Sequence, residues 1–179
     1  MMLALILVLF SLSVLLLVLH VARGQSAPVN NLEDLAGHTR PVDLEAFRNL
    51  VDPQEEEFLR ANLPTEDFYA VRRERLRAAV EYVSCTAHNA SILLRLGEAA
   101  RRNPDPQIAE AGQQLVDSAL RLRLYSLPAL VRLYVGIAVP QLHLPPAAVL
   151  ESYQHLSGLA TRLAVMQNPA RAPRVAAIL

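Results

Sequence analysis

The sequence predicts an all-helical protein: a single N-terminal transmembrane helix followed by a small helical bundle built on a long antiparallel helical hairpin. Three observations indicate this class. The chain opens with an apolar segment of membrane-spanning length, two later segments show helical periodicity on either side of a proline-rich turn, and no segment of the remainder alternates as strands do. A chain of 179 residues with only six glycines fits one small helical domain.

The membrane anchor is predicted over residues 1–23. From Leu3 to Leu19 the chain is apolar apart from Ser11 and Ser13, whose hydroxyls can bond to backbone carbonyls one turn earlier. As a helix this segment would extend about 30 Å, which matches the hydrocarbon core of a bilayer. We therefore expect contact with membrane lipid through this helix, in a single-pass protein.

A cleaved signal peptide is the alternative, because Ala22-Arg23-Gly24 resembles a cleavage site. The long apolar run and the lack of a preceding basic residue favour an uncleaved anchor instead. Basic residues follow the span, at Arg23, Arg40 and Arg48, and none precedes it. The positive-inside rule then predicts that the body of the protein faces the cytoplasm.

Residues 24–42 are predicted to form a linker, since they are rich in proline, asparagine and glycine, with one helical turn around Leu32 to Ala36. A helical domain is predicted over residues 43–168. Within it, Asp52-Pro53-Gln54-Glu55 is a helix-start pattern, with a capping carboxylate, a first-turn proline and a glutamate three residues after the cap. We expect a short helix from there to about Asn62.

The first arm of the hairpin is expected to start at Thr65, because Glu66 and Asp67 suit the positive end of a helix and no proline follows until Pro104. Apolar and small residues then recur at spacings of three and four, which places them on one seam. The seam consists of Leu76, Val80, Val83, Ala87, Ala90, Leu94 and Gly97.

A turn at Asn103-Pro104-Asp105-Pro106 separates this arm from a second seam. The second seam consists of Ile108, Ala111, Leu115, Ala119 and Leu122. A short connection between matched periods predicts an antiparallel pair of helices. Pro128 is expected to kink or end the second arm, with a helix continuing over Ala129 to Val139.

A third long helix is predicted over Pro146 to Gln167, which carries apolar residues at helical spacing and would close the bundle. Residues 169–179 are predicted to be a C-terminal tail. The segment from Leu124 to Leu144 is apolar enough to raise a second membrane span, but Arg132, Pro128 and Pro140 favour a kinked core or interface helix. Shallow contact of this segment with a membrane surface is a further alternative.

Charge is divided along the chain although the net charge is zero. Residues 33–67 hold ten acidic residues and three arginines, whereas residues 72–132 hold ten arginines and six acidic residues. Arg72, Arg73, Arg75 and Arg77 form the candidate interaction surface. We expect the acidic helix to fold back beside these arginines and mask them, and a solvated helix face is the alternative.

The residue types present argue against several chemistries. The chain contains no lysine, so Schiff-base catalysis and phosphate-loop lysines are excluded, and one cysteine permits neither an intrachain disulfide nor a thiolate metal cluster. Cys85 and His88 lie three residues apart on the long helix, but no nucleophile signature surrounds them. We predict no catalytic residues, no cofactor and no metal, and the charge pattern does not favour nucleic acid.

The sequence thus favours a non-catalytic scaffold, tether or regulator of a protein partner at the membrane surface. A helical sensor or lipid-contacting domain, with a pocket between Leu124 and Leu163, is the alternative. An enzyme with an unrecognised site is the third. A pocket with convergent polar groups would favour the last two, and a solid core with an exposed apolar seam would favour the first.

Overall fold

The computed structural model describes residues 35–139, 147–169, 173 and 175. The predicted anchor at residues 1–23 and most of the predicted linker lie outside the described residues, as does most of the C-terminal tail. The described part of the chain contains helices and no strand, which confirms the all-helical class. Its helices are α2 (Leu35–His38), α3 (Leu44–Val51), α4 (Pro53–Asn62), α5 (Thr65–Ala100), α6 (Pro106–Ala138) and α7 (Ala147–Gln167).

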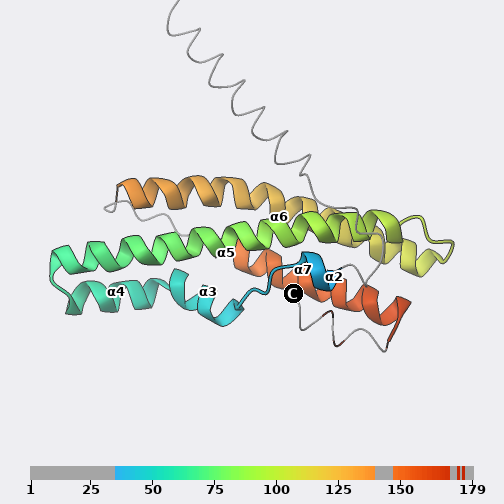
Figure 1. The fold of residues 1–179 in the computed structure, drawn as a ribbon, viewed down its shortest axis with the longest axis horizontal. Helices are drawn as coiled ribbons and strands as arrows, with labels where there is room; N and C mark the ends of the chain where they lie inside the picture. Colours follow the sequence, from blue (N-terminus) through green and yellow to red (C-terminus); the bar gives the residue numbers. More distant parts are fainter. Residues whose placement is uncertain (1–34, 140–146, 170–172, 174, 176–179) are drawn as a thin grey trace, which may run out of the picture.

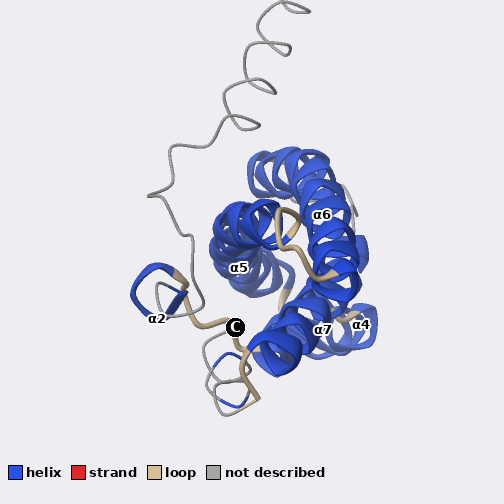
Figure 2. Ribbon diagram, turned by 90° about the vertical axis from the view of Figure 1, so that its right-hand side faces the viewer, coloured by secondary structure: helices blue, strands red, loops and turns tan. Residues whose placement is uncertain are grey.

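The two longest helices, α5 and α6, form the predicted antiparallel hairpin and run side by side along the length of the domain (Figure 1). Figure 2 looks along these helices and shows α7 beside them, so that α5, α6 and α7 make a helical bundle. The short helices α3 and α4 pack on α5, on the side away from α6 (Figure 1). Helix α5 is therefore the central element of the domain.

The caps of the short helices follow from the sequence. The Asp43 side chain accepts a hydrogen bond from the Ala46 backbone N–H at 2.9 Å and starts α3, while the Asp52 side chain accepts from the Gln54 N–H at 2.9 Å and starts α4. The helix predicted from Pro53 to Asn62 is confirmed at both ends.

The start of α5 at Thr65 is also as predicted, although Pro64 occupies the cap position and no side chain caps this end. The turn between α5 and α6 is fixed by its own side chains. The Asp105 N–H donates to Asn103 Oδ1 at 2.9 Å, and the Asp105 carboxylate accepts from the Gln107 N–H at 2.9 Å. This turn reverses the chain and places the two seams face to face.

The core fills the space between α5, α6 and α7, and its largest side chains are fully buried. They include Phe47, Leu93, Leu96, Leu115, Leu122, Leu133, Tyr153, Leu156 and Leu163. Most of the second seam and of the third helix's apolar positions belong to this core. On the first seam Leu76, Val80 and Leu94 are only partly buried, because α5 also turns residues toward α3 and α7.

Helices α5 and α6 approach each other closely at two glycines, Gly97 and Gly112. A Cβ atom built on Gly97 would lie 2.9 Å from the Gly112 carbonyl oxygen, and one built on Gly112 would lie 2.7 Å from the Arg101 backbone nitrogen. These distances are shorter than ordinary contacts, so only glycine fits at either position without moving a helix.

Pro128 does not end the second arm. Helix α6 continues through it to Ala138, and Pro128 itself is exposed to solvent. Because proline has no N–H, Pro128 cannot donate to the Leu124 carbonyl, and the Leu124 side chain is exposed on this side of the helix.

Residues 35–42 of the predicted linker lie within the described part of the chain. The helical turn expected around Leu32 to Ala36 is described as α2, from Leu35 to His38, and Leu35 is fully buried. The following residues are held on α5 through Arg40, so this part of the predicted linker belongs to the packed domain.

Among the described residues, no helix combines the length and the apolar character needed to cross a bilayer. Part of the tail also packs, since Val175 is 2% exposed and joins the core.

Candidate interaction surfaces

The four arginines of the predicted interaction surface are divided between two sides of α5. Arg72 is buried, and its Nε donates a hydrogen bond to Glu56 Oε1 of α4 at 2.9 Å. Arg75 donates from Nη2 to the Asn49 carbonyl oxygen at 2.7 Å, and its Nη1 lies 3.8 Å from Glu55 Oε1. The acidic helix thus folds back onto these two arginines, as the charge pattern predicted.

Arg73 and Arg77 are exposed, and Arg77 forms an ion pair with Glu74 one turn earlier on the same helix. Exposed pairs of this kind hold a side chain weakly, with an energy of about 0–1 kcal/mol. These two arginines are therefore accessible to an outside partner, and their role as an interaction surface stays a prediction. Arg72 and Arg75 serve contacts within the domain instead.

A buried polar cluster joins α5, α7 and the segment before α3. The Asn89 side chain accepts from the Arg40 N–H at 2.9 Å, and its Nδ2 donates to the Arg40 carbonyl and to the Tyr153 hydroxyl oxygen, both at 2.7 Å. Asn89 and Tyr153 are both fully buried. Burial raises the pKa of Tyr153 to about 12, with the hydrogen bond from Asn89 acting in the opposite direction. The cluster fixes three segments that are far apart in the sequence.

The structure gives the Cys85 and His88 pair a packing environment. Cys85 is half-buried, and the imidazole Nε2 of His88 lies 3.0 Å from the His38 carbonyl oxygen. One His88 ring nitrogen therefore contacts the backbone of α2, which helps to hold α2 on α5. Sequence spacing alone could not identify this contact, because the two histidines lie 50 residues apart.

A pair of cations spans α5 and α6. Arg123 is buried, and desolvation, together with the nearby charge of Arg95, lowers its pKa below the usual range of an arginine. Arg95 is half-buried on α5, and neither arginine occupies a position of the two predicted seams.

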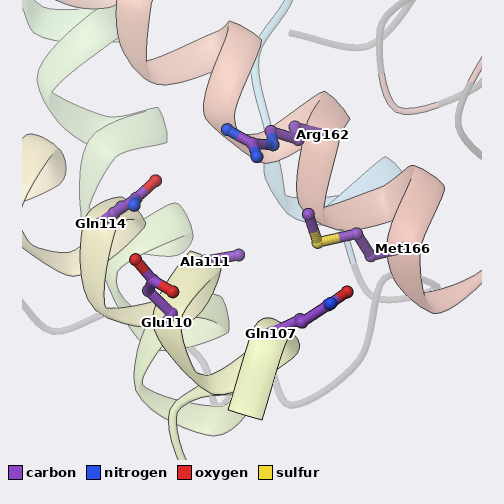
Figure 3. Close-up of a pocket in the computed structure, with 6 residues that line it drawn as sticks. All are labelled: Gln107, Glu110, Ala111, Gln114, Arg162 and Met166. Carbon is purple, nitrogen blue, oxygen red and sulfur yellow. The ribbon is translucent and has the colours of Figure 1, made fainter. Parts of the chain in front are cut away.

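Two grooves run between α6 and α7. The first has a volume of about 300 Å³ and is lined by Gln107, Glu110, Ala111, Gln114, Arg162 and Met166. Figure 3 shows Arg162 and Met166 on α7 and the other four residues on α6. The second, of about 250 Å³, is lined by Ser118, Arg121, Tyr125, Glu151, Ser152 and His155. Both are lined mainly by polar side chains, unlike the mostly apolar pockets that bind larger organic ligands.

The most distinctive surface feature is on the outer side of α6. Large apolar side chains recur there at helical spacing and are between 38% and 59% exposed. This surface, which we call the α6 apolar face, consists of Leu120, Leu124, Val131, Tyr134 and Val135. Since the opposite side of α6 supplies Leu122, Ala129 and Leu133 to the core, the second half of this helix is apolar on two sides.

The α6 apolar face also has a one-sided charge. Residues 118–139 contain three arginines and no acidic residue. Arg121 and Arg132 are exposed, whereas Arg123 is turned into the hairpin. By contrast, residues 43–67, which include α3 and α4, contain eight acidic residues and two arginines. The basic and acidic surfaces therefore lie on opposite sides of α5 (Figure 1).

Within the described segments, no three side chains of the histidine, cysteine, aspartate and glutamate types are grouped so as to hold a metal ion. The same residues contain no buried side-chain nitrogen or oxygen without a hydrogen-bond partner.

The chain matches no known family model, and no similar protein was found among curated proteins or solved structures.

Proposed function

We propose that the chain is a single-pass membrane protein whose helical domain is a non-catalytic scaffold or tether at the membrane surface. The observation that carries this proposal is the α6 apolar face. Large exposed apolar patches mark surfaces that meet a protein or a membrane, because leaving them in water is unfavourable. Leu122, Ala129 and Leu133 on the other side of α6 are buried in the core, so the α6 apolar face offers contact area on the surface of the domain.

The predicted N-terminal anchor supports the location. An apolar segment from Leu3 to Leu19 would hold the domain beside the bilayer, and the arginines that follow the segment favour a cytoplasmic body. A domain confined in this way meets its partners in two dimensions, which raises their effective concentration.

The alternative of a sensor with a pocket in the second half of the domain has less support. The groove near Tyr125 and His155 is lined mainly by polar side chains, and its volume of about 250 Å³ suits only a small polar molecule.

The test is photocrosslinking of the full chain in its native membranes. A photoreactive amino acid at Val131, which is 58% exposed on α6, should form a crosslinked adduct with the protein or lipid that covers the α6 apolar face. The same group at Phe58, which is 62% exposed on α4, is the matched control and should form far fewer. Membranes washed with alkaline carbonate should retain the chain. Release of the chain by carbonate, or equal crosslinking at both positions, would count against the proposal.

A further inference from the structure

We propose that the α6 apolar face lies on the surface of the bilayer that holds the N-terminal anchor, with Arg121 and Arg132 directed to anionic lipid headgroups. This inference rests on the proposed function, since it takes the anchor as present. It adds a second membrane contact to the chain and fixes which side of the domain faces the lipid.

The geometry of α6 fits a helix that lies in the plane of a membrane interface. The α6 apolar face spans residues 120–135 at spacings of four, seven and four, which keeps Leu120, Leu124, Val131 and Val135 on one side of a helix. Interfacial helices bury such a face by about 5–10 Å at the boundary between headgroups and acyl chains. Tyr134 extends the face with a ring whose hydroxyl group can stay at the level of the headgroups.

The charges near this face favour an anionic surface. Arg121 and Arg132 are exposed beside it and carry long side chains that can reach the headgroups while the apolar face is immersed. No carboxylate occurs between residues 118 and 139, so nothing on this stretch of α6 repels an anionic headgroup. A second copy of α6 would place arginines opposite arginines, which disfavours pairing of the two helices, although Glu151 of α7 lines the same groove as Arg121.

The remaining charges of the domain favour the same orientation. The acidic segment of residues 43–67 lies across α5 from α6, so docking through α6 turns this segment away from anionic lipid (Figure 1). Eleven residues, or twelve Cα–Cα steps, separate the predicted anchor at residues 1–23 from Leu35, and a chain of that length reaches at most about 43 Å. The domain is thereby kept close enough to the bilayer for α6 to meet it.

The experiment uses the full chain with Cys85→Ala, reconstituted in vesicles and carrying one nitroxide label. The label is placed at Val131→Cys on the α6 apolar face or at Phe58→Cys on α4 as the control. Its collisions with oxygen, which concentrates in lipid, are compared with its collisions with a water-soluble nickel complex. The vesicles contain phosphatidylcholine alone or phosphatidylcholine with phosphatidylserine.

In vesicles with phosphatidylserine, the label at Val131 should lose most of its accessibility to nickel and become more accessible to oxygen. The label at Phe58 should stay accessible to nickel. Leu124→Cys supplies a second position on the face and should behave like Val131→Cys.

The double variant Arg121→Gln and Arg132→Gln tests the charge contribution. The population of the docked state should fall about fivefold for each arginine removed, because a basic residue near an anionic surface contributes on the order of 1 kcal/mol. Arg102→Gln, which changes an exposed arginine at the hairpin turn, is the matched control and should have little effect.

Two results would overturn the assignment of lipid to this face while leaving the anchor intact. In the first, the chain resists carbonate extraction, but the label at Val131 stays as accessible to nickel as the label at Phe58. The other is a label at Val131 that is as well protected from nickel in detergent micelles as in vesicles and whose spectrum shows spin–spin broadening. That result would assign the α6 apolar face to contact with a second copy of the chain. Extraction of the chain by carbonate would instead refute the anchor, and this arrangement with it.

Discussion

Replacing Gly97 by alanine tests the close crossing of α5 and α6. The added Cβ atom would lie 2.9 Å from the Gly112 carbonyl oxygen and 2.9 Å from Val116 Cγ2. Ordinary contacts begin at 3.4 Å, so the new atom is about 0.5 Å too close to each. Because one of these neighbours is backbone, a side-chain rotation cannot relieve the contact. The helices must separate instead.

The expected magnitude follows from two opposing effects. Alanine favours a helix over glycine by about 0.8–1.0 kcal/mol in the absence of new contacts. Overpacking of a well-filled interface costs about 1–3 kcal/mol, and the upper part of that range applies where backbone must move. Gly97→Ala should therefore lower the free energy of unfolding by about 1–2 kcal/mol, or the Tm by about 2–8 °C for a domain of this size.

The assay is thermal and chemical unfolding of the full chain in detergent, followed by circular dichroism. Gly158→Ala is the control, because nothing lies within 4 Å of a Cβ atom at that position of α7. It should keep the helix-propensity gain and be stabilising by up to about 1 kcal/mol. Equal stabilisation by both substitutions would show that α5 and α6 are farther apart at Gly97 than the structure places them.

Three further predictions concern the polar contacts. Asn89→Ala should lower the free energy of unfolding by about 2–4 kcal/mol, because it removes the hydrogen bonds to the Arg40 backbone and the Tyr153 hydroxyl. In the same denaturant titration, the control Ser84→Ala at an exposed site should change it by less than about 0.5 kcal/mol. The pKa of Tyr153 is raised to about 12 in the folded chain, so its contribution to stability should be complete below pH 10 and be lost as the pH rises to about 12. The free energy of unfolding should therefore decline over this alkaline range. In Tyr153→Phe the share of the decline that Tyr153 causes should be absent. Glu56→Gln should lower the free energy of unfolding by about 1–2 kcal/mol, since it removes the charge that pairs with the buried Arg72. Glu74→Gln, on the exposed surface of α5, is the control. An equal loss in both variants would show that the contact between α4 and Arg72 contributes little.

Local signals in the sequence predicted most of the fold. The capping carboxylate and first-turn proline at Asp52 and Pro53 fixed the start of α4, and the turn at residues 103–106 fixed the hairpin. These features depend on hydrogen bonds within a few residues, which the sequence displays directly. Helix α7 was predicted from its period alone, because an apolar stripe 21 residues long has few alternatives.

Contacts between distant residues could not be predicted in this way. Asn89 lies on the buried side of α5, where its amide binds the Arg40 backbone 49 residues earlier and Tyr153 64 residues later. Nothing in the periodicity of α5 distinguishes this residue from a solvated asparagine. Of the two outcomes expected at Pro128, an end of the helix is ruled out, since α6 continues through it to Ala138 with buried residues on both sides of it.

The same distinction explains why the sequence did not decide between a core helix and an interface helix for the segment from Leu124 to Leu144. Periodicity shows that the first part of this segment is apolar on more than one side, but only the packed domain shows which side α5 covers. Burial of Leu133 and Ala129 accounts for one side. Each large side chain on the other side is about half exposed, so it forgoes about half of the roughly 1.5–3 kcal/mol that full burial would provide. Several such side chains in one row, bordered by arginines and free of carboxylates, are better explained by a surface that covers them than by solvation. An anionic bilayer supplies both the apolar layer and the charge that this row lacks.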